Sequence, residues 1–466
     1  MSVLRRTFAL LAAGGAAYGG WLYLQDDATR DRHRIIISPT PDRALLSHKN
    51  SFAAPRIAPV TFAYLGPMLR ALIDPELAHR MTIGVFALSP GIRHRLGLQD
   101  ASPSRPSLHV RAFGLTFANP VGIAAGFDKH CEAVHGLWDI GFGFVEIGSV
   151  TPEPQPGNEQ PRVFRLEPDR AIINRYGFNS DGCAAVKDRL MATLKARQSS
   201  LRPKILGVNL GKNKTSADST ADYVRGVQEL GPAADYLVVN ISSPNTPGLR
   251  ALQSKESLRQ LLTAVKSARD ALPIADPHRH SPARPPLLLK VAPDLTSEDA
   301  KDIAAVAVAV GIDGLIISNT TIARPPTLRS EFRQETGEAS LLLAASDHLP
   351  HAYLIVEWHC AGGLSGEPLF HPSTKLVGTF YQLTKGQIPI VGVGGISTGL
   401  QAYQKIRQGA TLVQLYTAFA YDGPLVVARV KHELAELLAR DGFKSVMDAV
   451  GADFRVPKEQ RAFKDE

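Results

Sequence analysis

The chain has 466 residues, of which 44% are hydrophobic and 21% charged, a balance that is typical of a globular protein and excludes a disordered one. Its three cysteines, at positions 131, 183 and 360, have no spacing that suggests a disulfide framework, an iron–sulfur cluster or another metal centre. The net charge of +8 comes from dispersed Lys and Arg residues, so we expect a surface compatible with an anionic membrane and no nucleic-acid partner.

The amino terminus, residues 1–25, has the features of a targeting segment followed by a transmembrane helix. Residues 1–6 include two arginines and no acid, and residues 7–24 are uncharged and mostly apolar. As a helix this stretch spans roughly 27 Å, close to a hydrocarbon core of about 30 Å. A cleaved secretory signal shares the basic start and the apolar middle. Because nothing downstream is typical of a disulfide-rich secreted protein, we favour an uncleaved anchor after mitochondrial import.

Residues 26–59 are polar and contain proline, which predicts a linker, and residues 60–92 then show two apolar patterns with helical spacing. Asp74-Pro75 separates the patterns as a cap and a first helical turn. We expect an amphipathic helical hairpin whose apolar face lies against lipid, or alternatively one that packs on the following domain as ordinary core. Both arrangements are compatible with a tunnel that admits a lipid-soluble molecule.

From residue 108 to residue 455 short apolar runs alternate with helical patterns, which indicates an α/β fold. Eight such runs, each followed by a helical stretch, are what a (β/α)8 TIM barrel requires. A doubly wound sheet is the alternative, but its G-x-G-x-x-G fingerprint is not evident after the first run. The predicted strands centre on residues 122–124, 144–146, 206–208, 237–239, 288–290, 315–317, 390–392 and 413–415.

The loop after the fourth predicted strand contains the candidate catalytic group. Residues 240–246, Asn-Ile-Ser-Ser-Pro-Asn-Thr, place amides and hydroxyls at the carboxyl end of a buried strand, where such barrels carry their chemistry. Ser243 is the hydroxyl that we consider as a base toward a small bound substrate. A capped helix start is the competing interpretation, since Ser, Asn and Thr all favour caps and turns.

The loop after the seventh predicted strand, Gly392-Val-Gly-Gly-Ile396, is typical of a phosphate cradle built from backbone N–H groups and a helix N-terminus. Small residues and a cation follow the first strand at positions 124–129. Lys290 lies inside the apolar fifth strand, where a buried charge needs a partner. Together these features predict a bound phosphorylated cofactor with a polar ring system.

Long motifs recur along this region in a fixed order: Asn119-Pro-Val-Gly-Ile-Ala-Ala-Gly-Phe-Asp-Lys129, Gly207-Val-Asn-Leu-Gly-Lys-Asn-Lys-Thr215, Val239-Asn-Ile-Ser-Ser-Pro-Asn-Thr246, Lys290-Val-Ala-Pro-Asp294 and Val391-Gly-Val-Gly-Gly395. They closely resemble the quinone-dependent (class 2) dihydroorotate dehydrogenases. The resemblance covers about residues 62–455, and the anchor with its hairpin is similar to the mitochondrial eukaryotic members.

The resemblance implies an oxidoreductase of pyrimidine (UMP) synthesis that converts (S)-dihydroorotate to orotate, with FMN as cofactor and ubiquinone as electron acceptor. It further implies a single amino-terminal anchor in the lipid of the mitochondrial inner membrane. Ser243 is then the base that takes a proton from substrate C5 while hydride leaves C6 for flavin N5. The related class 1 enzymes carry a cysteine at the base position, and none of the three cysteines falls there, which favours the quinone class.

The remaining site residues follow from the same resemblance. The implied substrate contacts are Lys129, Asn174, Asn240, Asn245, Asn319 and Thr320. The implied contacts with the FMN ring and ribityl chain are Ala125, Gly126, Ser149, Asn174, Asn209, Asn240, Lys290 and Ser318. The implied contacts at the phosphate end are Ser365, Gly366, Gly394, Gly395, Tyr416 and Thr417.

Ubiquinone is implied to enter between the two amino-terminal helices, with His79, Arg165 and Tyr416 as the polar groups along the tunnel. Considered without the family, His79 is equally well a surface-helix histidine and Arg165 an ordinary edge residue. At Arg70 the chain departs from the glutamine common in animal members, which leaves the contacts with the quinone head group open at this position.

Residues 338–362 interrupt the family pattern, which expects Gly337 to run almost directly into Gly363-Leu-Ser-Gly366. The codons of Gly337-Glu338 can contain a donor-like GTGAG, those of Ala361-Gly362 an acceptor-like CAG, and excision between them keeps the reading frame. We hypothesise a translated intron. A genuine surface loop is the alternative, since the entropy of loop closure grows only slowly with length.

Two other functions stay open from the sequence. An RNA-modifying flavin barrel would fit the basic charge, but it predicts a catalytic cysteine and an RNA-binding module, and neither is evident. A non-catalytic or FMN-deficient barrel, disabled by the insertion at 338–362, predicts an intact fold without flavin.

Overall fold

The computed structural model describes residues 70, 72–102, 105–197, 204–274, 282–330 and 362–455. The predicted anchor (1–25), the linker (26–59), most of the first helix of the hairpin and nearly all of the insertion at 338–362 therefore lie outside the described residues. In the part of the chain that is described, no helix is both long enough and apolar enough to cross a membrane.

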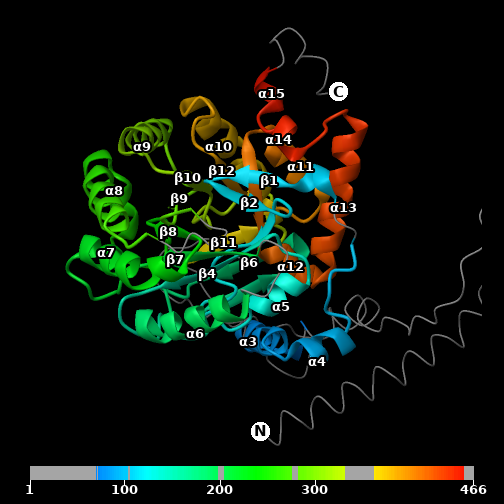
Figure 1. The fold of residues 1–466 in the computed structure, drawn as a ribbon, viewed down its shortest axis with the longest axis horizontal. Coiled ribbons are helices and arrows are strands. Elements are labelled where there is room, and N and C mark those ends of the chain that lie inside the picture. The colour runs from blue at the N-terminus through cyan, green and yellow to red at the C-terminus, as the bar shows by residue number, and fades with distance from the viewer. Residues whose placement is uncertain are drawn as a thin grey trace, which may run out of the picture. The chain divides into compact units, whose positions relative to one another are not determined.

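Eight parallel strands close into a barrel at the centre of the protein (Figure 1). Neighbouring strands follow the chain order, and the last strand, β13, pairs back with the first, β3. All eight predicted strand centres overlap these strands, so the predicted TIM barrel is confirmed. The barrel strands are β3 (Val121–Ile123), β4 (Phe144–Val150), β7 (Ile205–Leu210), β8 (Tyr236–Asn240), β9 (Leu287–Val291), β10 (Gly314–Ile317), β12 (Ile390–Val393) and β13 (Ala410–Leu415).

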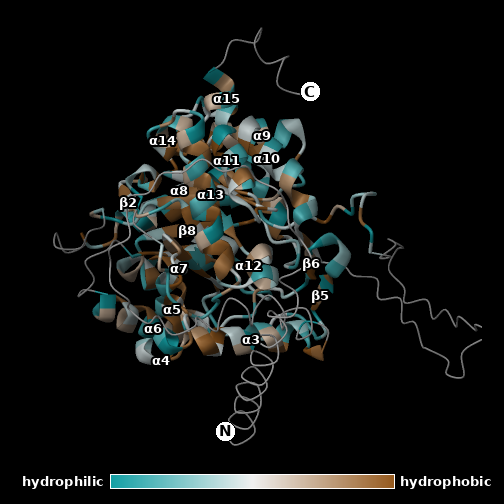
Figure 2. Ribbon diagram, turned by 90° about the vertical axis from the view of Figure 1, so that its right-hand side faces the viewer, coloured by the Kyte–Doolittle hydropathy of each residue, from teal (hydrophilic) through white to brown (hydrophobic). Residues whose placement is uncertain are grey.

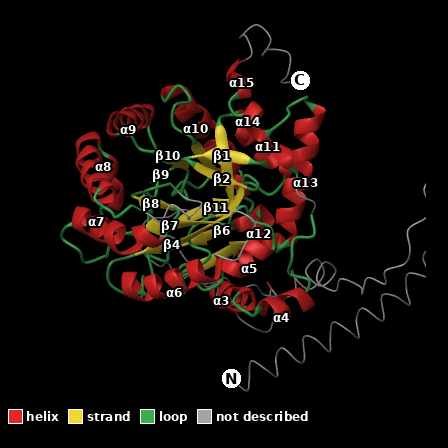
Figure 3. Cartoon of the chain, viewed as in Figure 1, coloured by secondary structure: helices red, strands yellow, loops and turns green. Residues whose placement is uncertain are grey.

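Helices surround the barrel on its outside (Figure 3). Two of them start with a capping box, Thr296 with Asp299 and Thr398 with Gln401, in which side chains satisfy the first free N–H groups. The helices of this layer are α5 (Val134–Asp139), α6 (Gly182–Arg197), α7 (Ser219–Leu230), α8 (Lys255–Asp270), α9 (Ser297–Val310), α10 (Phe370–Leu383), α11 (Gly399–Arg407), α12 (Thr417–Asp422), α13 (Leu425–Arg440), α14 (Val446–Ala449) and α15 (Ala452–Arg455).

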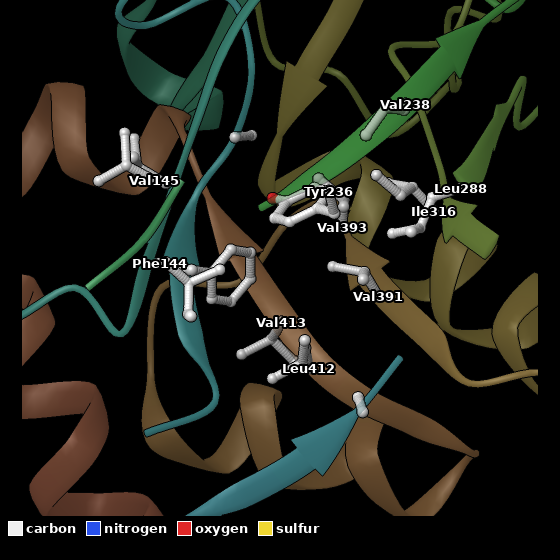
Figure 4. Packing of buried hydrophobic residues seen from close by; sticks show 14 of the residues in the cluster. Phe144, Val145, Tyr236, Val238, Leu288, Ile316, Val391, Val393, Leu412 and Val413 are labelled. Carbon is white, nitrogen blue, oxygen red and sulfur yellow. The ribbon is translucent and has the colours of Figure 1, made fainter. Parts of the chain in front are cut away.

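Aromatic and branched side chains fill the barrel interior, as in a packed core (Figure 4). The rings of Phe144 and Tyr236 meet edge to face with their centroids 6.4 Å apart. Glycines on neighbouring strands make room for them: a Cβ at Gly122 would lie 2.3 Å from the Phe144 ring, and one at Gly207 would lie 2.0 Å from the Tyr236 ring. The barrel is therefore closed at the amino ends of its strands, and its open end lies at their carboxyl ends.

Two small sheets that the sequence did not predict extend the barrel. β1 (Val110–Ala112) and β2 (Leu115–Phe117) form a hairpin. β5 (Val163–Leu166), β6 (Ala171–Asn174) and β11 (Gly363–Gly366) form a three-stranded antiparallel sheet, in which Ser365 pairs with Ile172. This second sheet brings the end of β6 and the residues after the insertion to the mouth of the barrel.

Helices α3 (Pro75–Phe86) and α4 (Pro90–Arg95) precede the barrel, and the Asp74 side chain caps α3 as expected. Figure 2 shows brown, apolar positions on the ribbon near α3. Large apolar side chains are exposed here: Leu72, Leu77, Ile92 and Leu96. The buried Glu76–Arg162 ion pair, with N–O distances of 2.8 and 3.1 Å, attaches α3 to the segment before β5.

Candidate active site

The carboxyl ends of the barrel strands open into a cavity of about 1180 Å³, a volume that includes its part open to solvent. Of the sequence-predicted site residues, Asn209, His79 and Arg165 do not line this cavity. The predicted residues that do line it are Ala125, Gly126, Lys129, Ser149, Asn174, Asn240, Ser243, Asn245, Lys290, Ser318, Asn319, Thr320, Ser365, Gly366, Gly394, Gly395, Tyr416 and Thr417. Residues from four of the five quoted motifs thus line one cavity, and the motif at 207–215 contributes no lining residue.

A fully buried carboxylate, Glu146 on β4, lies at the base of this cavity. It accepts hydrogen bonds from Asn209 Nδ2 at 2.9 Å and from Gln414 Nε2 at 2.7 Å, and Lys290 Nζ lies 4.0 Å from it. Glu146 is therefore the partner that a buried lysine on the fifth barrel strand requires. Burial lowers the pKa of Lys290, and the charge of Glu146 opposes this shift. The Oε1 atom of Gln414 is buried without a hydrogen-bond partner among the described residues.

A network of amides and hydroxyls forms the wall above Glu146. Asn240 Nδ2 donates to Ser149 Oγ at 2.9 Å and to Asn209 Oδ1 at 3.1 Å. Asn319 Nδ2 donates to Ser242 Oγ at 2.9 Å, on the strand end that carries Asn240. Asn209 thus lies behind the wall and orients the side chains that line the cavity.

Ser243 lies in a loop that does not cap a helix. The next helical turn begins at Leu249 with Gly248 at its cap position, so the competing interpretation of this loop as a helix start is wrong. Ser243 is 7% exposed, and its Oγ accepts from the backbone N–H of Asn245 at 3.3 Å. The side chain of Asn245 donates to Asn174 at the end of β6, at 3.2 and 3.3 Å. The hydroxyl therefore lies in a largely water-excluded pocket among amide groups.

Lys129 provides a cation in the lining of the cavity. Its Nζ donates to the carbonyl of Gly126 at 2.8 Å and lies 3.8 Å from the centre of the Tyr176 ring. Burial, opposed by the charge of Glu76, lowers the pKa of Lys129 to about 7. A bound carboxylate would favour the charged form of this amine.

Small residues and hydroxyls form the far end of the cavity. Gly394 and Gly395 both have positive φ, +111° and +71°, and a Cβ at Gly395 would lie 2.5 Å from the backbone of Phe370 at the start of α10. Only glycine therefore fits a turn that lies this close to the helix. Thr417 Oγ1 donates to Ser365 Oγ at 2.9 Å beside this turn. The arrangement is that of a phosphate cradle.

The predicted tunnel residues lie on the α3 side of the cavity. His79 Nε2 donates to the carbonyl of Phe127 at 2.7 Å, so its Nδ1 faces the hydroxyl of Tyr176 at 3.4 Å as an acceptor. Burial lowers the pKa of His79 to about 3, and the ring stays neutral. His79 is thus half-buried rather than a surface histidine. Arg165 donates to the carbonyls of Arg70 and Ile73 at 2.7 and 2.8 Å, which joins β5 to the residues just before α3.

The segment Tyr176-Gly-Phe-Asn179 also lines the cavity, and sequence reasoning missed it. Its signal was a Gly-Phe-Asn turn after the apolar run at 171–173. Asn179 Oδ1, like the Gln414 oxygen, is buried without a hydrogen-bond partner among the described residues. The described cysteines, Cys131 and Cys183, do not line the cavity, and burial raises the pKa of each thiol to about 12.

Comparison with known proteins gives one consistent result. The dihydroorotate dehydrogenase family model matches residues 107–341 and 348–438. The mouse protein "Dihydroorotate dehydrogenase (quinone), mitochondrial" is 53% identical over 393 residues, 84% of this chain and 90% of the relative. "Dihydroorotate dehydrogenase (quinone)" of Rhodospirillum rubrum is 49% identical over 387 residues, 83% of this chain and 93% of the relative.

A solved structure agrees with these relatives. The ligand-free dihydroorotate dehydrogenase of Eimeria tenella superposes with a TM-score of 0.72 at 45% identity, over 82% of this chain and all of that one. The same enzyme in complex with ferulenol superposes with a TM-score of 0.72 at 44% identity.

Proposed function

Because this chain belongs to the quinone-dependent dihydroorotate dehydrogenase family, as its motifs predicted, we propose that it oxidises dihydroorotate to orotate in the described cavity and reduces a quinone with the electrons. The observation that carries the site assignment is that residues from four separate motifs line one cavity at the carboxyl ends of the barrel strands. This is the step that introduces the ring double bond in pyrimidine synthesis.

The family depends on a flavin, and FMN is the flavin that we propose here. Three observations support FMN. The Gly394-Gly395 turn forms a phosphate cradle, and the small residues Ala125 and Gly126 leave room for a flat ring. Lys290 and the partnerless Gln414 oxygen offer polar groups beside Glu146. When bound, FMN supplies the acceptor for the hydride that leaves substrate C6. Lys290 and Ser149 would hold the polar edge of the ring, and Thr417 and Ser365 the phosphate end.

The residues of this chain bind the substrate and move its proton. Lys129 would pair with the dihydroorotate carboxylate, because the other cations that line the cavity, Arg170 and Lys290, already lie near carboxylates of the protein. The side-chain amides would hold the substrate ring through its own amide groups: Asn174, Asn240, Asn245 and Asn319, with Thr320 beside them. Ser243 would take the proton from C5. A serine is a weak base in water, and the exclusion of water around Ser243 is what makes this role physically reasonable.

The α3 side of the cavity is the proposed path of the quinone. His79 and Tyr416 contact Phe127 beside the cavity, with ring centroids 5.1 and 6.0 Å from that ring. Exposed apolar side chains on α3 and α4 would lie against lipid. The name of the mouse relative includes the word mitochondrial, and we propose the mitochondrial inner membrane for this chain, with residues 1–25 as its single anchor.

The direct test is steady-state turnover of the purified full chain. Dihydroorotate and a short-chain ubiquinone should together yield orotate and quinol in equal amounts, and extraction should release FMN in a ratio of about one per chain. Turnover without quinone dependence would reject the acceptor assignment. A folded protein that releases no flavin would support the FMN-deficient alternative.

A further inference from the structure

A buried lysine lies directly behind the Gly394-Gly395 turn. Lys405 on α11 is 0% exposed, and its stem lies so close to β12 that a Cβ at Gly392 would be 2.6 Å from Lys405 Cδ. Its Nζ donates to Ser373 Oγ at 2.7 Å and to Thr374 Oγ1 at 2.9 Å. Both hydroxyls belong to the first turns of α10.

Ser373 connects this lysine to the turn itself. Its hydroxyl lies 3.2 Å from the carbonyl oxygen of Gly394 and 3.2 Å from that of Phe370, and its one proton is shared between these two acceptors. Because the Gly394 carbonyl is held toward α10, its negative end is kept on the side away from the cavity that Gly394 lines. Two successive contacts therefore link the ammonium of Lys405 to the wall of the phosphate cradle.

The charge of Lys405 has no carboxylate partner within ion-pair distance in the part of the chain that the structure describes. Burial alone holds the pKa of Lys405 well below its usual value. By contrast, the buried lysine Lys431 pairs with Asp100, and Lys290 lies near Glu146. Lys405 also lies beside the N-terminus of α10, which is the positive end of the helix and adds to the positive potential instead of cancelling it. Burial therefore favours the neutral amine, and an anion bound nearby would favour the charged ammonium form.

The cavity wall at this end offers little other free positive charge. Arg170 is the cation that lines it, and its guanidinium is already bound by Glu367 at 2.8 Å and by Asp422 at 2.5 Å. The cation without a carboxylate partner that lies nearest to a phosphate on the Gly394-Gly395 turn is therefore Lys405, behind the turn, and not a residue of the cavity wall.

We propose that Lys405 is a positioning residue for the cofactor phosphate: its ammonium supplies the counter-charge behind the Gly394-Gly395 turn, and its hydrogen bond to Ser373 fixes that turn. The inference rests on the proposed function, because it requires a phosphorylated flavin in this cradle. It assigns no contact between Lys405 and substrate.

The test compares FMN with riboflavin, which lacks the phosphate. Flavin-free full-length protein is titrated with each flavin, and the ratio of the two dissociation constants is the readout. Lys405→Met should weaken FMN by at least about tenfold while riboflavin changes little, because a charge near a phosphate interacts strongly at short range in a poorly screened interior. Lys405→Gln keeps a hydrogen-bond donor for Ser373 without the charge, and should show most of the same loss. Lys375→Met, an exposed lysine on the same helix α10, removes one charge as a control and should keep the ratio of the unmodified protein.

Each outcome has a defined meaning. A Lys405→Met protein that keeps the FMN preference, or that weakens both flavins equally, overturns the proposal. Unmodified protein with no preference for FMN over riboflavin would instead reject the phosphate cradle, and with it the proposed cofactor site. If neither position-405 variant folds, Ser373→Ala decides: a reduced FMN preference supports the proposal, and an unchanged one overturns it.

Discussion

The ammonium of Lys129 lies 3.8 Å from the centre of the Tyr176 ring, and the hydroxyl of Tyr176 lies 3.4 Å from Nδ1 of His79. Tyr176 thus contacts both Lys129, which is proposed to bind the substrate carboxylate, and His79, which is proposed to lie along the quinone path. The guanidinium of Arg162, paired with Glu76 of α3, lies 5.1 Å from the same ring. The two halves of the reaction are therefore adjacent in space but are served by different residues, which makes them separable by mutation.

The affinity for orotate is expected to fall as the pH rises above about 7, the pKa of Lys129 in the substrate-free protein. A bound carboxylate raises this pKa, so its contribution to affinity is complete below the free pKa and is lost as the pH rises toward the bound pKa. Within that window the dissociation constant should rise by up to about tenfold per pH unit. Titration of flavin absorbance with orotate measures it. A Lys129→Met protein should bind weakly at every pH, and an unchanged affinity of the unmodified protein between about pH 6 and pH 9 would contradict the assignment.

Ser243→Ala is expected to slow the reduction of the flavin by dihydroorotate by about 10²- to 10⁴-fold, the usual contribution of a general base. Orotate should still bind, because the surrounding amides remain in place. Rapid mixing without oxygen measures the rate, and orotate titration is the control for an intact site. Ser243→Cys should recover part of the activity at high pH, where a thiolate replaces the hydroxyl. A Ser243→Ala protein at full rate would exclude Ser243 as the base.

His79→Ala is expected to impair only the quinone half of the reaction. The reduction by dihydroorotate should keep its rate, whereas the KM for ubiquinone should rise, because the contact between α3 and Phe127 is lost. In the unmodified protein quinone reduction should show no step near pH 6.5, since the pKa of His79 is lowered to about 3. If the variant reduces its flavin more slowly with dihydroorotate but keeps normal quinone kinetics, the assignment of His79 to the quinone path is wrong.

Glu76→Gln is expected to loosen α3 by about 3 kcal/mol, since it leaves a poorly solvated arginine without its charged partner. Hydrogen exchange of the α3 amides measures this local stability. Lys255→Met, which removes an exposed ion pair with Asp302, is the matched control and should cost less than about 1 kcal/mol. The pKa of Glu76 is lowered in the folded protein, so the contribution of the pair is present above the unfolded pKa and is lost as the pH falls through the folded value. Equal effects of the two variants would mean that α3 is held mainly by other contacts.

A chain without residues 338–362 is expected to fold and to bind FMN at least as tightly as the full chain. Gly362 has a φ of +149°, and a Cβ there would lie 2.5 Å from the carbonyl oxygen of Asn174. Excision would put Gly337 in this position, so the glycine that the geometry requires is kept. Flavin content and thermal melting of both versions measure the effect. If excision causes loss of flavin, or if the main transcript retains the segment, residues 338–362 are a genuine part of the protein.

The barrel was predictable from sequence because buried parallel strands appear as short apolar runs, each ending in polar or small residues. The sheet of β5, β6 and β11 was not, because Gly363-Leu-Ser-Gly366 has no strand pattern and its partner, β6, lies far away in the chain. Glu146 was also missed, although an acid inside an apolar strand shows the same need for a partner that identified Lys290. The roles of individual site residues came from the family resemblance, since spacing alone cannot show which amide faces a ligand.

The most direct test of the central claim is anaerobic addition of dihydroorotate to the purified full chain while the flavin absorbance is recorded. The described cavity predicts that the oxidised flavin band bleaches as orotate forms, and that ubiquinone then restores the band. A protein that contains FMN but keeps its oxidised spectrum with dihydroorotate would contradict both the substrate assignment and the role of Ser243.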